Sequence, residues 1–259
     1  MTISVLTDNI AGPLTASEHG LSYLIESDGK RILFYTGQSD LFLKNAAVMG
    51  VSLKDIDLII LSHGHFDHGN GLGYLHGDTL LCHPGCFIRR YRGSDNSYIG
   101  LKNSREELSG KFNLITSREP YRISKSIVFA GEIPRITPFE SKLTSFVMED
   151  GTPDFVTDDS ALIITLPQGL FVITGCGHAG IVNTMEHASA ITGIKEIYGI
   201  IGGFHLNEDD LQTGETVKYL MTRNVSHVLP SHCTAGAALA RFRSTFNSPT
   251  VRTGDIFSY

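Results

Sequence analysis

The segment HGHFDH, at positions 63–68, places four side chains of metal-ligand type within six residues. His63 and His65 alternate, so their imidazoles can point to the same side of an extended loop. Asp67 and His68 follow after a turn and can face a second position nearby. Imidazole and carboxylate donors together suit zinc, iron or manganese. We therefore predict a site for two divalent transition metal ions, with zinc as the first expectation and iron or manganese as alternatives.

A pair of such ions would lower the pKa of a shared water, so that a hydroxide nucleophile exists at neutral pH. The protein then needs no Ser or Cys nucleophile, and Asp67 becomes a candidate catalytic residue that orients the nucleophile. The alternative interpretation treats the cluster as solvated turn residues. Only Ser62 separates the cluster from the apolar run 56–61, and this favours the metal site because ligands bind preferentially where buried strands end.

Three later apolar runs also end in turns that carry a histidine: TGCGH with His178, GGFH with His205 and PSHCTAG with His232. Given the first cluster, His178 and His232 are predicted metal ligands. His205 is a candidate catalytic residue, and three roles stay open for it: it ligates a metal, donates to the substrate or caps the following segment.

Four other residues have two interpretations each. Asp159 is either a carboxylate ligand or an ordinary turn acid. Cys176 is expected to be a buried inert thiol, with a soft metal ligand as the alternative. His19 and His83 are expected to be structural histidines, with a contact to the site or the substrate as the alternative.

The elements that must position these residues are short β-rich runs and amphipathic helical patterns. The turn Asp28-Gly29 suits a hairpin between the second and third strands. The region 89–154 has poor periodicity and is expected to form loops that cover a site, with strands at 126–130 and 144–148. The other expected strands are 3–6, 21–26, 31–35, 56–61, 161–166, 170–174, 197–202 and 225–229, and the expected helices are 39–50, 181–192 and 214–223.

Composition limits the class of protein. With 259 residues, 41% hydrophobic and 19% charged, the chain can bury a core without disulfides, and the four cysteines are expected to be free thiols. No linker composition interrupts the sequence, so a single domain spanning 1–259 is expected. The net charge of −6 and scattered basic residues predict a small-molecule substrate rather than nucleic acid.

The sequence has no run of about twenty apolar residues and no basic, signal-like amino terminus. We therefore expect no membrane association and a cytoplasmic location. A homodimer is kept as one alternative for the oligomeric state.

The segments LSHGHFDHGNGL, TGCGHAGIVNT, GGFHL and SHCTAG, in this order, resemble the metallo-β-lactamase superfamily. Within it, the branch of the dihydropterin-methyl-ribofuranosylaminobenzene-phosphate synthase is the most similar. The resemblance implies an α/β fold, a four-layer αβ/βα sandwich of two packed β-sheets flanked by helices, with a dinuclear metal site at one edge. It also assigns the ligands, with one metal held by His63, His65 and His178 and the other by Asp67, His68 and His232.

Two positions depart from the family pattern. Tyr35 stands where the family usually has an Asp before Thr-Gly, an acid that orients a metal-binding histidine. Cys176 lies where many members carry an aspartate that bridges the metals.

The first functional hypothesis is a metal-dependent hydrolase in which metal-bound hydroxide attacks a small phosphorylated or ester substrate. The alternative within enzymes is a synthase-type transferase that joins a pterin pyrophosphate to a ribofuranosylaminobenzene phosphate. A non-catalytic metal or ligand sensor on the same fold is the alternative from another class. A redox diiron protein is disfavoured, because the chain has no spare residues for an electron-donor domain.

Overall fold

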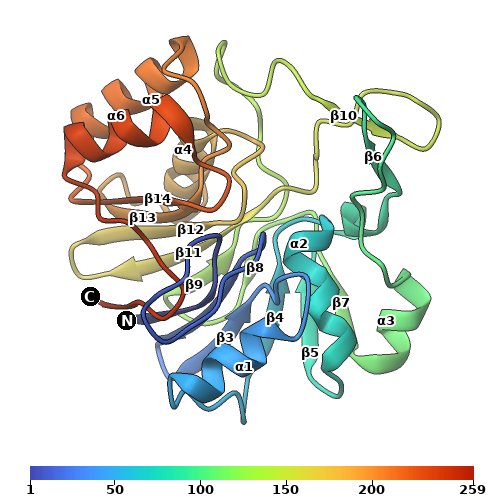
Figure 1. Ribbon diagram of the computed structural model, residues 1–259. Helices are drawn as coiled ribbons and strands as arrows, with labels where there is room; N and C mark the ends of the chain where they lie inside the picture. Colours follow the sequence, from blue (N-terminus) through green and yellow to red (C-terminus); the bar gives the residue numbers. More distant parts are fainter. The chain divides into compact units, whose positions relative to one another are not determined.

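The computed structural model describes residues 1–259, and the chain divides into two compact units, each with its own sheet (Figure 1). The first unit comprises Met1–Ser117, Ser145–Asp154 and Val251–Tyr259, and the second comprises Arg118–Thr144 and Phe155–Thr250. The single domain expected over 1–259 stays a prediction. None of the helices combines the length and the apolar character that crossing a membrane requires.

A seven-stranded sheet with the order β15-β1-β2-β3-β4-β5-β7 forms the first unit. Strands β15, β1, β2 and β3 pair antiparallel, whereas β3, β4, β5 and β7 run parallel. The two-residue turn of Asp28 and Gly29 joins β2 to β3 with positive φ at both residues, as a primed hairpin turn requires. The bounds are β1 (Thr2–Thr7), β2 (Ser22–Ser27), β3 (Lys30–Phe34), β4 (Leu58–Leu61), β5 (Thr79–Cys82), β7 (Asn113–Thr116) and β15 (Ile256–Ser258).

The same unit contains short helices and one further strand pair. Helix α1 contacts β1, α3 contacts β7, and α2 continues into the 3₁₀ helix η1. The antiparallel pair consists of β6 and β10. The bounds are α1 (Leu41–Val48), α2 (Phe66–Gly69), η1 (Asn70–Tyr74), η2 (Pro84–Phe87), α3 (Arg105–Lys111), β6 (Arg90–Arg92) and β10 (Phe146–Met148).

The second unit is built on a six-stranded sheet with the order β14-β13-β12-β11-β9-β8. Strands β12, β13 and β14 run parallel, and α4, α5 and α6 group beside them, with α4 on β12 and α6 on β14 (Figure 1). In the core, the rings of Phe204 and Phe242 meet edge to face, 5.2 Å apart. The bounds are β8 (Tyr121–Arg122), β9 (Ile127–Phe129), β11 (Ala161–Leu166), β12 (Gly169–Thr174), β13 (Ile197–Gly203), β14 (His227–Ser231), α4 (Ile181–Thr192), α5 (Leu211–Thr222) and α6 (Gly236–Phe246).

The expectation that 89–154 forms mainly loops is wrong for α3 and β7, and β7 completes the edge of the first sheet. The start of α3 is a capping box: Ser104 accepts from the Glu107 N–H, and the Glu107 carboxylate accepts from the Ser104 N–H. That pattern is visible in the sequence, whereas a four-residue strand has too few positions to show a period. The strands expected at 126–130 and 144–148 are confirmed as β9 and β10, and the sequence analysis also missed α6 and β15.

Helix α4 has no side-chain cap of its own, because Gly180 occupies the N-cap position. The buried Glu140, 42 residues upstream of Val182, instead accepts hydrogen bonds from the N–H groups of Val182 (2.8 Å) and Asn183 (2.9 Å). Burial raises the pKa of Glu140 above its ordinary 4.5, although these hydrogen bonds oppose the shift.

A raised pKa in the folded state makes stability depend on pH. The contribution of Glu140 is fully present below 4.5 and is lost as the pH rises through the raised pKa. In Glu140→Gln this pH-dependent loss of stability should be absent. The free energy of unfolding of the wild type should therefore fall relative to that of the variant as pH increases. Urea denaturation across this pH range measures the difference, with Glu215→Gln, at a partly exposed glutamate of α5, as control. An identical pH profile for the wild type and Glu140→Gln would contradict the assignment.

Candidate metal centre

Parallel strands bring the first group of predicted residues to one edge of the first sheet. Because β3, β4 and β5 are parallel neighbours, the residues that follow their carboxyl ends lie at the same edge. Tyr35 follows β3, Ser62 and His63 follow β4, and His83 follows β5. The buried strand that was expected before the histidine cluster is thus confirmed.

The histidines of HGHFDH gather around His63. Its ring centroid lies 4.7 Å from that of His65 and 4.5 Å from that of His68. A ring nitrogen of His63 lies within 4.8 Å of one of His65, and a ring nitrogen of His63 also lies within 4.8 Å of one of His68. All three side chains are buried, and so is Asp67. Packed imidazoles with a carboxylate form a donor set that suits a divalent cation, since protonating the rings would bury like charges side by side.

Backbone contacts hold this segment in place. The N–H groups of Leu21 and Thr36 donate to the carbonyl oxygens of Asp67 (3.2 Å) and His68 (2.9 Å). Gly64 lies against the backbone of Cys86 so closely that a Cβ atom would be 1.8 Å from the Cys86 carbonyl oxygen. Only glycine therefore allows His63 and His65 to occupy these positions.

Two hydroxyl groups orient the ring of His63. Its Nδ1 lies 3.0 Å from Ser62 Oγ and 3.3 Å from the Tyr35 hydroxyl, and these two hydroxyls hydrogen-bond to each other. Tyr35 is fully buried and has φ of 69°, a conformation that is strained for an aromatic residue. The resemblance to the family predicted an acid at position 35, and in this chain the hydroxyls of Tyr35 and Ser62 contact the His63 ring. Sequence reasoning missed Ser62, although it directly precedes His63.

Tyr35→Phe should weaken metal binding about tenfold. This is the lower end of the loss in metal affinity seen when a residue that hydrogen-bonds to a metal ligand is removed. The fold should persist, because the phenyl ring keeps its packing against Phe34 and His68. Competition with a chelator measures the affinity. Tyr219→Phe, which removes the hydroxyl that donates to Glu186, is the matched control and should leave metal affinity unchanged. Unaltered affinity in Tyr35→Phe would exclude a role for its hydroxyl.

Asp67 has a histidine on each side. Its Oδ2 lies 3.2 Å from Nε2 of His19 and 3.6 Å from Nε2 of His68. His19 thus contacts a predicted site residue, which was the alternative to its structural interpretation. The Nδ1 of His83 accepts the Gly85 N–H at the start of η2, a contact that agrees with the structural interpretation.

The second unit brings together the histidines that follow β12, β13 and β14. The ring centroids of His178 and His205 lie 4.4 Å apart. One ring nitrogen of His232 and the sulfur atoms of Cys176 and Cys233 all lie within 4.8 Å of one another. The Cys233 thiol donates to the Cys176 carbonyl oxygen (3.3 Å). Cys233 was not identified as a site residue from the sequence, although it adjoins His232.

The backbone is strained just after β13 and β14. His205 and His232 both have φ of 50°, the left-handed region that non-glycine residues rarely adopt and that concentrates at functional sites. His205 is exposed by its accessible surface, but the protein atoms around its ring still lower its pKa by desolvation, and the neighbouring His232 lowers it further. A lowered pKa keeps the His205 ring neutral at neutral pH.

Asp159 supports the turn that carries His178. Its Oδ2 accepts the N–H of Ala179 (2.8 Å), and burial raises its pKa to about 7. The carboxylate therefore has a positioning contact beyond that of an ordinary exposed turn acid. A role as a metal ligand stays a prediction.

Comparison with known proteins identifies the family. Residues 18–79 match the metallo-β-lactamase superfamily domain. The chain is 36% identical over 255 residues to an uncharacterized protein of Methanocaldococcus jannaschii, with 95% of each chain covered. It is also 35% identical over 253 residues to the 7,8-dihydropterin-6-methyl-4-(beta-D-ribofuranosyl)-aminobenzene-5'-phosphate synthase of that organism, covering 89% of this chain and 85% of the relative. The chain belongs to the metallo-β-lactamase superfamily.

A solved member of the superfamily confirms the fold. The crystal structure of Tm1679, a metal-dependent hydrolase of the β-lactamase superfamily, matches with a TM-score of 0.89 and 30% identity, covering 100% of this chain and 99% of that one. The predicted α/β sandwich class is thereby confirmed. Superfamily proteins generally bind divalent metals, and the two units of this chain each contain a cluster of suitable donors.

Proposed function

We propose that this protein is a metal-dependent hydrolase that cleaves a small phosphorylated or ester substrate. The observation that carries the proposal is the buried cluster of imidazoles around His63, beside Asp67 at the carboxyl edge of a parallel sheet. Imidazole and carboxylate groups gathered in this way form a donor set that suits a divalent transition metal ion. The proposed ligands, with zinc in first place, are His63, His65 and His178 for one ion and Asp67, His68 and His232 for the other.

The chain's own residues have distinct roles in this proposal. When bound, the metals act as Lewis acids and make water a stronger acid. Ser62 and Tyr35 fix the ring of His63, and His19 fixes the carboxylate of Asp67. Asp67 accepts a hydrogen bond from the nucleophile and orients it. Neutral His205 donates an N–H hydrogen bond to the negative charge that develops on the substrate.

A second candidate is a synthase that joins a pterin to a ribofuranosylaminobenzene phosphate. The 35% identity to a protein of that name favours it. Both reactions require the protein to stabilise negative charge, since each develops such charge on oxygen atoms near the proposed metal ligands. Either way, we propose a small-molecule substrate, no nucleic-acid partner and a cytoplasmic location.

Metal analysis combined with turnover tests the proposal. Protein purified without chelator is analysed for transition metals and assayed with a bis-aryl phosphodiester and an aryl phosphomonoester, before and after metal addition. About two equivalents of metal with metal-dependent turnover would support the hydrolase. Bound metal without turnover of either ester would favour the synthase. Protein that binds no metal even after addition would overturn both.

A further inference from the structure

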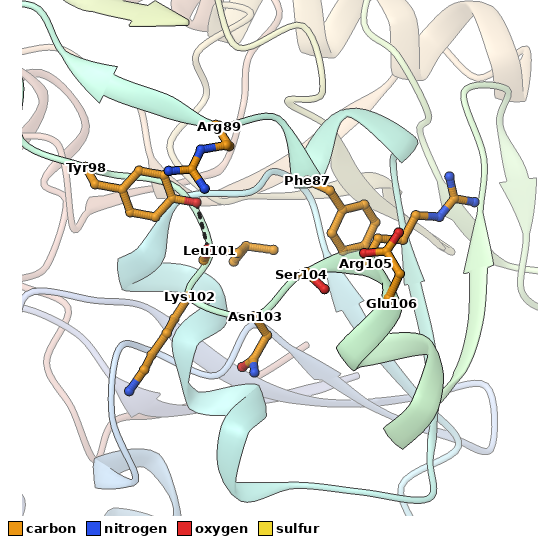
Figure 2. Close-up of a pocket in the computed structure, with 9 residues that line it drawn as sticks. All are labelled: Phe87, Arg89, Tyr98, Leu101, Lys102, Asn103, Ser104, Arg105 and Glu106. Atoms are coloured by element: carbon orange, nitrogen blue, oxygen red, sulfur yellow. Dashed lines mark hydrogen bonds between the residues drawn. The ribbon is translucent and has the colours of Figure 1, made fainter. Parts of the chain in front are cut away.

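The first unit contains a cavity of about 390 Å³ between η2 and the start of α3. Figure 2 shows that Arg105 points away, beyond Phe87, from Arg89. Arg89 is itself paired with Glu149 (2.9 Å). The two arginines of this cavity therefore do not converge on one ligand. Two cysteines of the second unit, in contrast, do converge.

Cys176 and Cys233 lie two residues beyond the ends of β12 and β14, the strands on either side of β13 (Figure 1). Their sulfur atoms lie within 4.8 Å of each other, and neither sulfur is in a disulfide. The Cys233 thiol donates to the carbonyl oxygen of Cys176 (3.3 Å). The Cys233 side chain is therefore directed across the end of β13 toward the other cysteine.

Glycine at position 203 leaves the space between the two cysteines open. Gly203 is the last residue of β13, and a Cβ atom there would lie 2.4 Å from Sγ of Cys233 and 3.1 Å from Cα of Cys176. The backbone around it is fixed, because the Gly203 N–H donates to the Gly175 carbonyl oxygen (2.8 Å) and the Thr174 hydroxyl donates to the Gly203 carbonyl oxygen (3.0 Å). The strand ends thus hold the two sulfurs close together with no side chain of β13 between them.

The turn that carries Cys233 is anchored to the residue after β13. The Thr234 hydroxyl accepts the Phe204 N–H (2.9 Å), and the Thr234 N–H donates to the Ser231 carbonyl oxygen (2.9 Å). In this turn Cys233 is partly exposed, whereas Cys176 is only 4% exposed. Because access controls the reactivity of a thiol, a dissolved oxidant meets Cys233 first.

We propose that Cys233 and Cys176 are a site of reversible disulfide formation, with a low-molecular-weight disulfide as the oxidant. The Cys233 sulfur loses its proton and attacks one sulfur of the small disulfide, and one small thiolate leaves. The Cys176 sulfur loses its proton and attacks Sγ of Cys233, and the second small thiolate leaves. Two electrons and two protons thereby pass from the protein to the small disulfide, which becomes two thiols.

The geometry allows this bond to close. A disulfide requires the sulfurs to approach to about 2 Å. Rotation of the two side chains about their Cα–Cβ bonds brings the sulfurs toward each other through the space that Gly203 leaves open. In a reducing compartment a disulfide of this kind is transient and responds to the redox state.

The disulfide also affects the proposed metal ligand His232. This residue directly precedes Cys233, has φ of 50°, and places a ring nitrogen within 4.8 Å of both sulfurs. Joining the sulfurs changes the contacts of the His232 ring and restrains the turn in which it lies. That this change weakens metal binding rests on the proposed function, whereas the disulfide itself does not depend on it.

Thiol counting on metal-free protein tests the disulfide. Incubation with oxidised glutathione should remove two of the four thiols, measured with a chromogenic thiol reagent after denaturation. Mass spectrometry of unreduced peptides should show Cys176 linked to Cys233, and dithiothreitol should restore all four thiols. Cys176→Ser should stop at one glutathione adduct on Cys233. The control Cys82→Ala, at a buried cysteine of the first unit, should form the same link as the wild type.

Retention of all four thiols, a link between any other pair of cysteines, or a lasting glutathione adduct on wild-type Cys233 would overturn the proposal. Zinc competition with a chelator then compares the oxidised protein with protein reduced and freed of reductant. Zinc affinity at least about tenfold lower in the oxidised form supports the effect on His232. Equal affinity overturns that effect alone. A protein that forms the disulfide but binds zinc in neither form overturns the zinc centre and leaves the disulfide in place.

Discussion

His65→Ala should abolish metal-dependent turnover while leaving the fold largely intact. His65 is buried, and its ring contacts those of His63 and Phe146. Loss of a proposed direct ligand should lower metal affinity by more than about 100-fold, which exceeds the effect of removing a residue that only hydrogen-bonds to a ligand. The fold should persist, because the His65 side chain forms no capping hydrogen bond to α2. Turnover, metal content and circular dichroism on the same preparation measure these effects.

His76→Ala is the matched control, since His76 is an exposed histidine of the same unit. It should keep wild-type metal content and turnover. Unchanged turnover in His65→Ala would remove the catalytic assignment of the whole cluster. Lost turnover together with lost secondary structure would instead give His65 a structural role.

Gly64→Ala should both destabilise the protein and displace His63 and His65, the proposed ligands on either side. The added Cβ would lie 1.8 Å from the carbonyl oxygen of Cys86 and 2.7 Å from its Cα. Both are backbone atoms, so no side-chain rotation relieves the overlap. We expect a loss of at least about 3 kcal/mol in the free energy of unfolding, the upper end of the usual cost of overpacking. Metal affinity should fall as well, because His63 and His65 must move apart from their present contact.

Gly110→Ala provides the comparison. A Cβ on Gly110, in the last turn of α3, would meet no atom within 4 Å. Alanine favours the helix over glycine, so this variant should be more stable by up to about 1 kcal/mol. Urea denaturation and metal competition distinguish the two. Wild-type stability and metal affinity in Gly64→Ala would show that the segment can separate from η2 without consequence.

Local patterns in the sequence determined much of the fold and most of the candidate site. The helix at 181–192 and the turn of Asp28 and Gly29 were predicted correctly, because periodicity and turn chemistry depend on neighbouring residues. The placement of His63 after a buried strand was predicted for the same reason. Short elements such as β7 were missed, since four residues carry little pattern. The capping box of Ser104 and Glu107 was a readable signal that was overlooked.

Only the tertiary structure decided which distant residues meet at these strand ends. The parallel register of β3 with β4 brings the Tyr35 hydroxyl to His63, and the fold of the first unit brings His19 to Asp67. Glu140 likewise reaches the start of α4 from a loop 42 residues upstream of Val182. The order and register of strands depend on the packing of the whole sheet, which no short window of sequence contains. The sequence thus specified the types of the proposed ligands and the strand ends that carry them, and the three-dimensional packing selected their partners.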